Sequence, residues 1–313
     1  MDIALILLNP DCLYLSRRNI CLLKQFAYAY TEGMKKPLKL TLIAAPIALI
    51  GLGAAVWVSL SGITVSRQSP PKFLTHDVVD PAQIYAVSKF RSGEGHDFSG
   101  AGETCRSMKH YLMPQMTLED VRYMQEHQGM FRSPDGKTDL TIYAPANGTV
   151  TQIVEEHTPI GRQVYFAPDA ATMTVRLFHI YPKDGLKAGQ HVSSGEQLGV
   201  VPAGQTFDVS VQYGRAPFAP DEYVSYFDVM PDNLFAAWQA RGIKDRAQVI
   251  ISRAERDANP FQCGSGDQRE MFVHPANYDA DADDVHLSGY VKVVDPGREQ
   301  AQQQNNQQNG GRQ

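Results

Sequence analysis

The chain has 313 residues, of which 43% are hydrophobic and 20% are charged. This ordinary globular composition excludes a collagen-like protein, a wholly disordered protein and a small disulfide-rich protein. The 29 Lys and Arg residues stand against 34 Asp and Glu residues, which gives a net charge of -5. The chain therefore lacks the broad basic surface that nucleic-acid binding requires.

The charges are unevenly distributed, and their asymmetry indicates a membrane span. Residues 1–39 carry six basic and three acidic side chains and end in a basic cluster, Lys35, Lys36 and Lys39. Residues 40–65 contain no charged side chain and as a helix would cross about 30 Å of hydrocarbon. Because the basic flank of a span faces the cytoplasm, we expect a single-pass inner-membrane protein with a cytoplasmic segment over 1–39 and an extracytoplasmic C-terminal domain.

A secretory signal peptide is the alternative interpretation of this region. Met34 would then be the true start in place of Met1, and Lys35 and Lys36 would form the basic segment before the apolar run. No small-x-small cleavage site follows the apolar residues, which favours an uncleaved anchor. Both interpretations export the rest of the chain.

Beyond the span, the sequence predicts a linker, a β domain and a polar tail. Residues 66–82 are rich in Pro and Ser and are typical of an extended linker. Residues 83–298 form the domain, with a helical C-terminal part, and residues 299–313, mostly Gln and Asn, should be disordered.

Strand-like alternation dominates the domain from residue 139 onward. Asn147-Gly148 lies between two alternating runs, which is typical of a hairpin turn. Further strands are expected at 162–168, 172–182, 196–203, 206–213 and near 285–294, and short helices at Thr117, Asn233–Ala240 and Arg253–Ala258. We therefore expect a mainly β fold, an antiparallel β-sandwich or barrel-sandwich hybrid with a few short helices.

Cys105 and Cys263 are the only cysteines beyond the span. Two thiols in an oxidising compartment predict one disulfide, and a single pair lacks the four-ligand spacing of structural zinc. The alternative is that Cys105 is an activated nucleophile beside Arg106 and near His110. With the disulfide formed, the basic residues around it would line a groove for an anionic ligand such as a glycan carboxylate or a phosphate.

Three segments of the domain resemble the β core of the lysostaphin-like (LytM-type) zinc endopeptidases, which cut peptidoglycan cross-bridges. They are Tyr143–Val150, Phe178–Ile180 and Val192–Gly199, and the likeness extends from Gly93 to Tyr213. The family's order is an H-x-x-x-D motif, an A-P-x-x-G-x-V hairpin, a Y-x-H-L strand, a glycine-rich turn and an H-x-H strand.

The resemblance assigns roles to individual residues, and the chain departs from the family at most of them. Asp97 matches the aspartate ligand, but Gly93 stands where the histidine ligand belongs. His179 matches a catalytic histidine. Asp208 stands in place of the other catalytic histidine, and Ser210 in place of the last zinc ligand.

These departures predict a degenerate metal site. Catalytic zinc needs three protein donors, and a neutral hydroxyl is a poor one, so we expect no resident cofactor. The alternative is a rearranged zinc site built from Asp97, His96 and Asp208. The candidate ligand-binding residues are Arg106, Lys109, His110 and Ser210.

Three functions follow as hypotheses. The first is a membrane-anchored envelope protein with a non-catalytic peptidase-like domain, which binds peptidoglycan or regulates a cell-wall hydrolase. The second is an active zinc endopeptidase that cuts peptidoglycan through the rearranged site. The third is a lipoyl- or biotinyl-like carrier or a membrane-fusion-adaptor-like hybrid domain, although no lysine occupies the Asn147-Gly148 tip and no long heptad hairpin is present.

Overall fold

The computed structural model describes residues 14–15, 18–19, 69–127, 134, 139–156, 160–213, 221–266, 269–275 and 278–289. The chain divides into two compact units, Met1–Leu60 and Ser61–Gln313. In the first unit, β1 (Tyr14–Leu15) pairs antiparallel with β2 (Arg18–Asn19). The predicted span over 40–65 and the predicted tail over 299–313 lie outside the described residues. Within the described ranges, no helix has the length and apolar character needed to cross a membrane.

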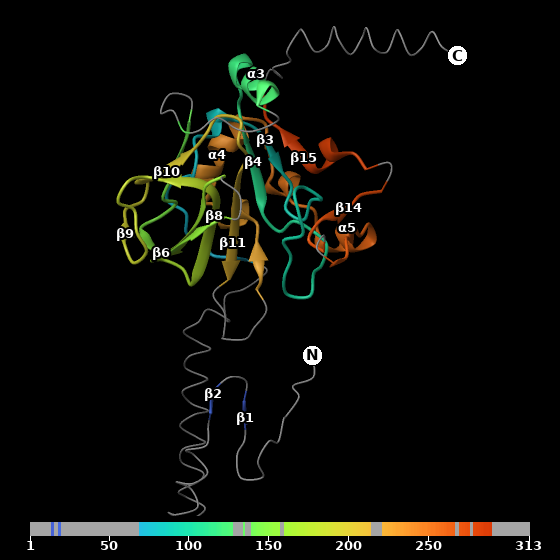
Figure 1. Ribbon diagram of the computed structural model, residues 1–313, viewed down its shortest axis with the longest axis horizontal. Helices are drawn as coiled ribbons and strands as arrows, with labels where there is room; N and C mark the ends of the chain where they lie inside the picture. Colours follow the sequence, from blue (N-terminus) through green and yellow to red (C-terminus); the bar gives the residue numbers. More distant parts are fainter. Residues whose placement is uncertain are drawn as a thin grey trace, which may run out of the picture. The chain divides into compact units, whose positions relative to one another are not determined.

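An antiparallel sheet dominates the second unit (Figure 1). Its main path runs β15-β3-β4-β11-β8-β7-β6-β9, with β10 joined to β5 and β8, and β12 joined to β11. The bounds are β3 (Ile84–Ser88), β4 (His110–Pro114), β5 (Leu140–Tyr143), β6 (Gly148–Glu155), β7 (Arg162–Pro168), β8 (Met173–Pro182), β9 (His191–Val192), β10 (Gln197–Val201), β11 (Phe207–Tyr213), β12 (Tyr223–Val224) and β15 (Asp284–His286). The predicted mainly β, antiparallel character is confirmed.

Short helices and a small hairpin complete this unit. The helices are α3 (Leu118–Glu126), α4 (Asp232–Ala240) and α5 (Arg253–Ala258), with 3-10 turns η1 (Pro81–Gln83), η2 (Tyr226–Val229), η3 (Arg246–Val249) and η5 (Ala280–Asp283). The three predicted helices are confirmed, and Thr117 caps α3 through a capping box with Asp120. A separate hairpin pairs β13 (Gln262–Cys263) with β14 (Phe272–Val273).

The hairpin predicted around Asn147-Gly148 does not form. β5 pairs with β10, whereas β6 pairs with β7 and β9. The Asn147 side chain accepts a hydrogen bond from the Ser194 backbone, and so ties this bend to the turn before β10. Gly148 is needed because a Cβ there would lie 2.3 Å from the Ala167 carbonyl oxygen. Gly148 therefore allows close packing of β6 against β7, and Asn147 ties the bend to the turn before β10.

The two faces of β11 are both buried but differ in chemistry. Phe207, Val209 and Val211 belong to the main hydrophobic core, which η2 and α4 complete with Phe227, Phe235 and Trp238. Asp208 and Ser210 alternate with these apolar residues and point to the opposite face. A buried acid on that face requires a charged partner, and this requirement defines the candidate site.

Candidate functional site

Three neighbouring strands bring Asp208, His179 and Lys109 together. In the register of the sheet, Asp208 of β11 lies opposite Phe178 of β8 and Tyr111 of β4. The Asp208 Oδ2 atom lies 2.7 Å from Lys109 Nζ and 3.2 Å from His179 Nε2. The structure thus unites the two residues for which a catalytic role was predicted, and adds Lys109, which immediately precedes β4.

The Lys109 ammonium is buried, and three aromatic rings lie against it. The side chain is 1% exposed, and its Nζ lies 5.3 Å from the ring centroid of Phe98 and 4.7 Å from those of Tyr111 and Phe178. Burial by itself lowers the pKa of Lys109, but the Asp208 charge, together with Tyr111 and the hydrogen bonds to both, leaves that pKa above its ordinary value. Burial likewise raises the pKa of Asp208, and Lys109 and His179 more than reverse this. The pair is therefore ionic.

His179 lies between two carboxylates. Its Nδ1 lies 2.7 Å from Glu156 Oε2, while its Nε2 faces Asp208. Its φ of 63° falls in the left-handed region, which is uncommon for a residue other than glycine and marks local strain. Burial lowers the pKa of His179, but hydrogen bonds and charges from Asp208 and Glu156 dominate and raise it to about 9. At neutral pH the ring is an imidazolium, which cannot accept a proton as a general base.

The titration of His179 is a direct test of this arrangement. We expect its ring to titrate near pH 9 in NMR spectra of the folded chain, and Glu156→Gln to lower that midpoint because one carboxylate is lost. Since the folded-state pKa lies above 6.5, the group stabilises the fold at lower pH, and this contribution is lost as pH rises through about 9. Glu155→Gln is the matched control, because Glu155 pairs with Arg162 instead. A wild-type midpoint at or below 6.5 would contradict the assignment.

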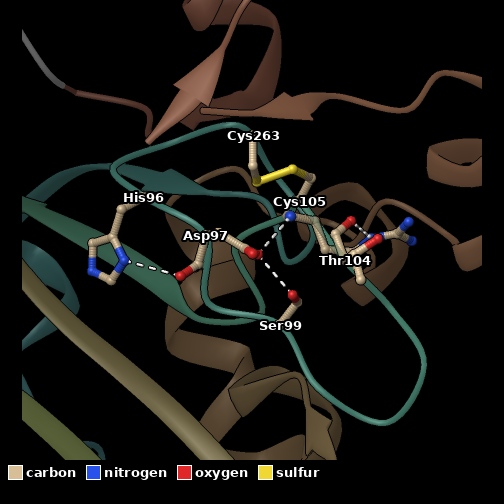
Figure 2. Close-up of a disulfide and its surroundings, with 7 residues drawn as sticks. His96, Asp97, Ser99, Thr104, Cys105 and Cys263 are labelled. Carbon is tan, nitrogen blue, oxygen red and sulfur yellow. Dashed lines mark hydrogen bonds between the residues drawn. A yellow bond between two sulfur atoms is a disulfide. The ribbon is translucent and has the colours of Figure 1, made fainter. Parts of the chain in front are cut away.

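Asp97 lies apart from this cluster, beside the disulfide. Its Oδ1 accepts hydrogen bonds from Ser99 Oγ at 2.7 Å and from the Arg106 backbone at 3.1 Å. Figure 2 shows the Asp97 carboxylate turned toward the Cys105–Cys263 bond and the His96 ring extending to the other side. The predicted disulfide is confirmed, and it excludes the alternative in which Cys105 is a free nucleophile.

The predicted zinc ligands do not form one donor set. Among the described residues, the group of His, Cys, Asp or Glu donors that converge within 4.8 Å is Asp97, Cys105 and Cys263. The two sulfurs of that group are bonded to one another and offer no thiolate. His96 faces a different neighbour, because its Nε2 lies 3.4 Å from Lys109 Nζ.

The predicted ligand-binding residues also separate. Arg106 pairs with Glu103 at 2.9 Å and with Asp257 at 2.8 Å, and so stabilises the loop around the disulfide. His110 is fully buried on the core side, where it contacts the Ser88 carbonyl and Ser225 Oγ, each at 2.8 Å. Burial lowers the pKa of His110 to about 4, so this ring is neutral and structural.

Ser210 and Lys109 remain on the Asp208 face. Ser210 is 1% exposed, and its Oγ has no hydrogen-bond partner among the described residues. Sequence reasoning missed Tyr111 and Glu156. Tyr111 could have been identified, because it lies two residues after Lys109 in an extended segment. Glu156 follows the end of β6 and carries no such signal.

The residues around Asp208 do not fit a catalytic zinc ion. Such an ion needs three donors with free lone pairs. The Asp208 carboxylate is neutralised by the Lys109 ammonium, and the protonated His179 ring has no lone pair to offer. A metal cation at this point would also meet the ammonium charge at contact distance.

Comparison with solved structures gives matches of low identity and low TM-score. The chain is similar to lysostaphin, to Csd3 of Helicobacter pylori and to a zinc containing peptidase from Vibrio cholerae, at 9%, 16% and 14% identity and TM-scores of 0.27, 0.29 and 0.24. The matches cover 44%, 54% and 48% of this chain and 52%, 39% and 41% of those chains. This chain therefore spans about half the length of these proteins or less. No protein-family model and no curated protein matches the chain.

Proposed function

We propose that the C-terminal domain is a non-hydrolytic, metal-independent domain that binds peptidoglycan from the outer side of the inner membrane. The observation that carries this proposal is the Lys109 ammonium, held 2.7 Å from Asp208 at the point where the sequence resemblance would place metal chemistry. The lysine supplies the positive charge that the carboxylate needs, but it has no open coordination position for an activated water.

Hydrolysis of a peptide cross-bridge also needs a base to activate that water. His179 is the side chain to which the resemblance assigns this role, and its two carboxylate partners keep the ring protonated. Asp208 Oδ2 is paired with both Lys109 and His179, and the side chain is 0% exposed. The cluster is therefore suited to orienting charged groups and holding a ligand. It lacks both the site that activates a water and the general base that cleavage requires.

Membrane attachment and location are part of the same proposal. The uncharged segment over 40–65, preceded by three lysines, supports an anchor that leaves the domain facing the cell wall. The disulfide between Cys105 and Cys263 agrees with an oxidising compartment. The carrier-domain alternative is weakened, because the Asn147-Gly148 bend that would present a prosthetic group does not join paired strands.

A purified full-length chain in detergent tests the proposal through three measurements. We expect substoichiometric zinc by metal mass spectrometry, no release of soluble fragments from purified peptidoglycan sacculi, and co-sedimentation of the chain with the sacculi. Cellulose particles under the same conditions are the control for non-specific sedimentation. One zinc per chain together with fragment release would instead establish the active-peptidase hypothesis, and absence of co-sedimentation both with and without dithiothreitol would contradict wall binding.

A further inference from the structure

Phe98 is one of the three aromatic side chains that enclose Lys109 on the polar face around Asp208. Its ring centroid lies 5.3 Å from Lys109 Nζ and 5.1 Å from Arg176 Cζ. The same ring contacts the rings of Phe178 and Tyr223, with centroids 5.6 Å and 4.8 Å away. Phe98 is partly exposed, whereas Lys109 is buried beneath it. The ring therefore helps to separate the Lys109 ammonium from solvent, while His179 remains 20% exposed.

Polar atoms beneath this ring lack partners. Arg176 Nε, Asp208 Oδ1 and Ser210 Oγ are buried and have no hydrogen-bond partner among the described residues. They are neighbours, because Ser210 pairs with Arg176 in the register of β11 and β8, and Asp208 lies two residues away on the same face. Buried polar groups are almost always paired in folded proteins. Three unpaired groups at one place indicate a surface that an incoming ligand would complete.

Phe98 belongs to a short segment, residues 93–99, which we call the cover. The cover is held on one side by the β13–β14 hairpin region. The Asp97 backbone N–H donates to the Glu270 carbonyl at 2.6 Å, and His96 forms an isolated bridge with Met271. Met271 in turn accepts a hydrogen bond from the Gly264 N–H, next to Cys263.

The other side of the cover is held by the segment that follows Cys105. The Phe98 N–H donates to the Arg106 carbonyl at 3.1 Å, and the Phe98 carbonyl accepts from the Met108 N–H at 2.9 Å. The Cys105–Cys263 disulfide joins this segment covalently to the β13–β14 hairpin. The disulfide thus links covalently the two segments that hold the cover, the β13–β14 hairpin and the residues after Cys105.

We infer that residues 93–99 regulate access to the Asp208 face, and that the Cys105–Cys263 disulfide locks them in the closed position. This inference rests on the proposed wall-binding function. Opening requires a dithiol reductant: one of its thiolates attacks a sulfur of the bridge, two electrons pass to Cys105 and Cys263, both become thiols after protonation, and the reductant leaves as a disulfide. The uncovered face presents Lys109, Arg176 and His179 against two carboxylates, a surplus of positive charge that suits the carboxylate of a wall peptide.

Amide hydrogen exchange of the full-length chain tests the lock itself. We expect dithiothreitol to accelerate exchange at the Asp97, Phe98 and Met108 amides on the order of tenfold, while the amides of β11 keep their protection. Unchanged exchange in the cover would overturn the inference. Acceleration shared equally by β11 would also overturn it, because the disulfide would then hold the whole fold and not the cover.

Phe98→Ala provides the second test, with the disulfide intact. We expect this variant to co-sediment with peptidoglycan sacculi more than the oxidised wild type, because the charged face is then open. Tyr123→Ala on α3 is the matched control, an aromatic truncation away from the cover. Binding equal to wild type would count against the cover. If no form binds sacculi, the proposed function fails, and the exchange experiment still decides whether the disulfide locks the segment.

Discussion

Replacement of Lys109 by methionine is expected to lower the free energy of unfolding by about 3–5 kcal/mol, as measured by urea denaturation of the oxidised chain. The methionine keeps the volume and the apolar contacts with the three rings, but it leaves the Asp208 carboxylate buried without its principal counter-ion. His179 alone then neutralises Asp208 while it also serves Glu156. The loss is large because an unpaired buried charge is far more costly than a missing surface ion pair.

Two further variants separate this effect from general damage. Lys109→Met combined with Asp208→Leu should recover most of the lost stability, because an apolar pair can replace a buried ion pair. Lys183→Met removes the half-exposed pair with Glu196 and should cost less than about 1 kcal/mol. Equal losses in the two lysine variants would mean that the buried pair has no special role.

The second large effect is expected at Asp77, a buried acid whose hydrogen-bond partners are separate from the Lys109 cluster. Its carboxylate accepts hydrogen bonds from Tyr226 Oη at 2.8 Å and from Trp238 Nε1 at 2.6 Å. Asp77→Ala leaves both buried donors unpaired and should lower the free energy of unfolding by about 2–4 kcal/mol. Asp80→Ala is the control, because exposed Asp80 caps only η1 and should cost about 1 kcal/mol.

Asp77 also predicts a pH dependence with an unusual sign. Burial raises its pKa from 3.8 to about 6, although hydrogen bonds from Trp238 and Tyr226 oppose the shift. The unfolded chain therefore releases its proton at lower pH than the folded chain, and the Asp77 contribution to stability falls as pH rises from 3.8 to about 6. Urea denaturation across this range should show that slope in the wild type and a flatter one in Asp77→Asn. A wild-type slope that Asp77→Asn leaves unchanged would show that other groups produce it.

The helices and strands could be predicted from the sequence because capping residues and alternating apolar residues are local signals. Thr117 with Asp120 is a complete capping box, and α5 occupies the predicted Arg253–Ala258. Strands β7, β8 and β11 follow their alternating runs. The pairing of strands is not set by a local signal, and for that reason Asn147-Gly148 suggested a hairpin where β5 instead pairs with β10 and β6 with β7.

The site was only partly accessible for the same reason. His179 and Asp208 were identified through the family resemblance, and the need of Asp208 for a partner followed from its inward position. Which cation meets it depends on the register between β4 and β11, and the sequence contains no signal for that register. His96 and Asp97 are adjacent in sequence, yet the backbone turns one toward Lys109 and the other toward the disulfide.

The pairing of β15 with β3 bears on how the protein is made. Asp284 lies opposite Ser88 and His286 opposite Ala86, so the strand that borders β3 is synthesised long after it. Until then β3 has one open side with unpaired backbone groups, which can recruit a strand from another nascent molecule. A chain that ends before residue 284 would retain that open side. Premature termination would therefore yield a product that self-associates instead of a shorter soluble one.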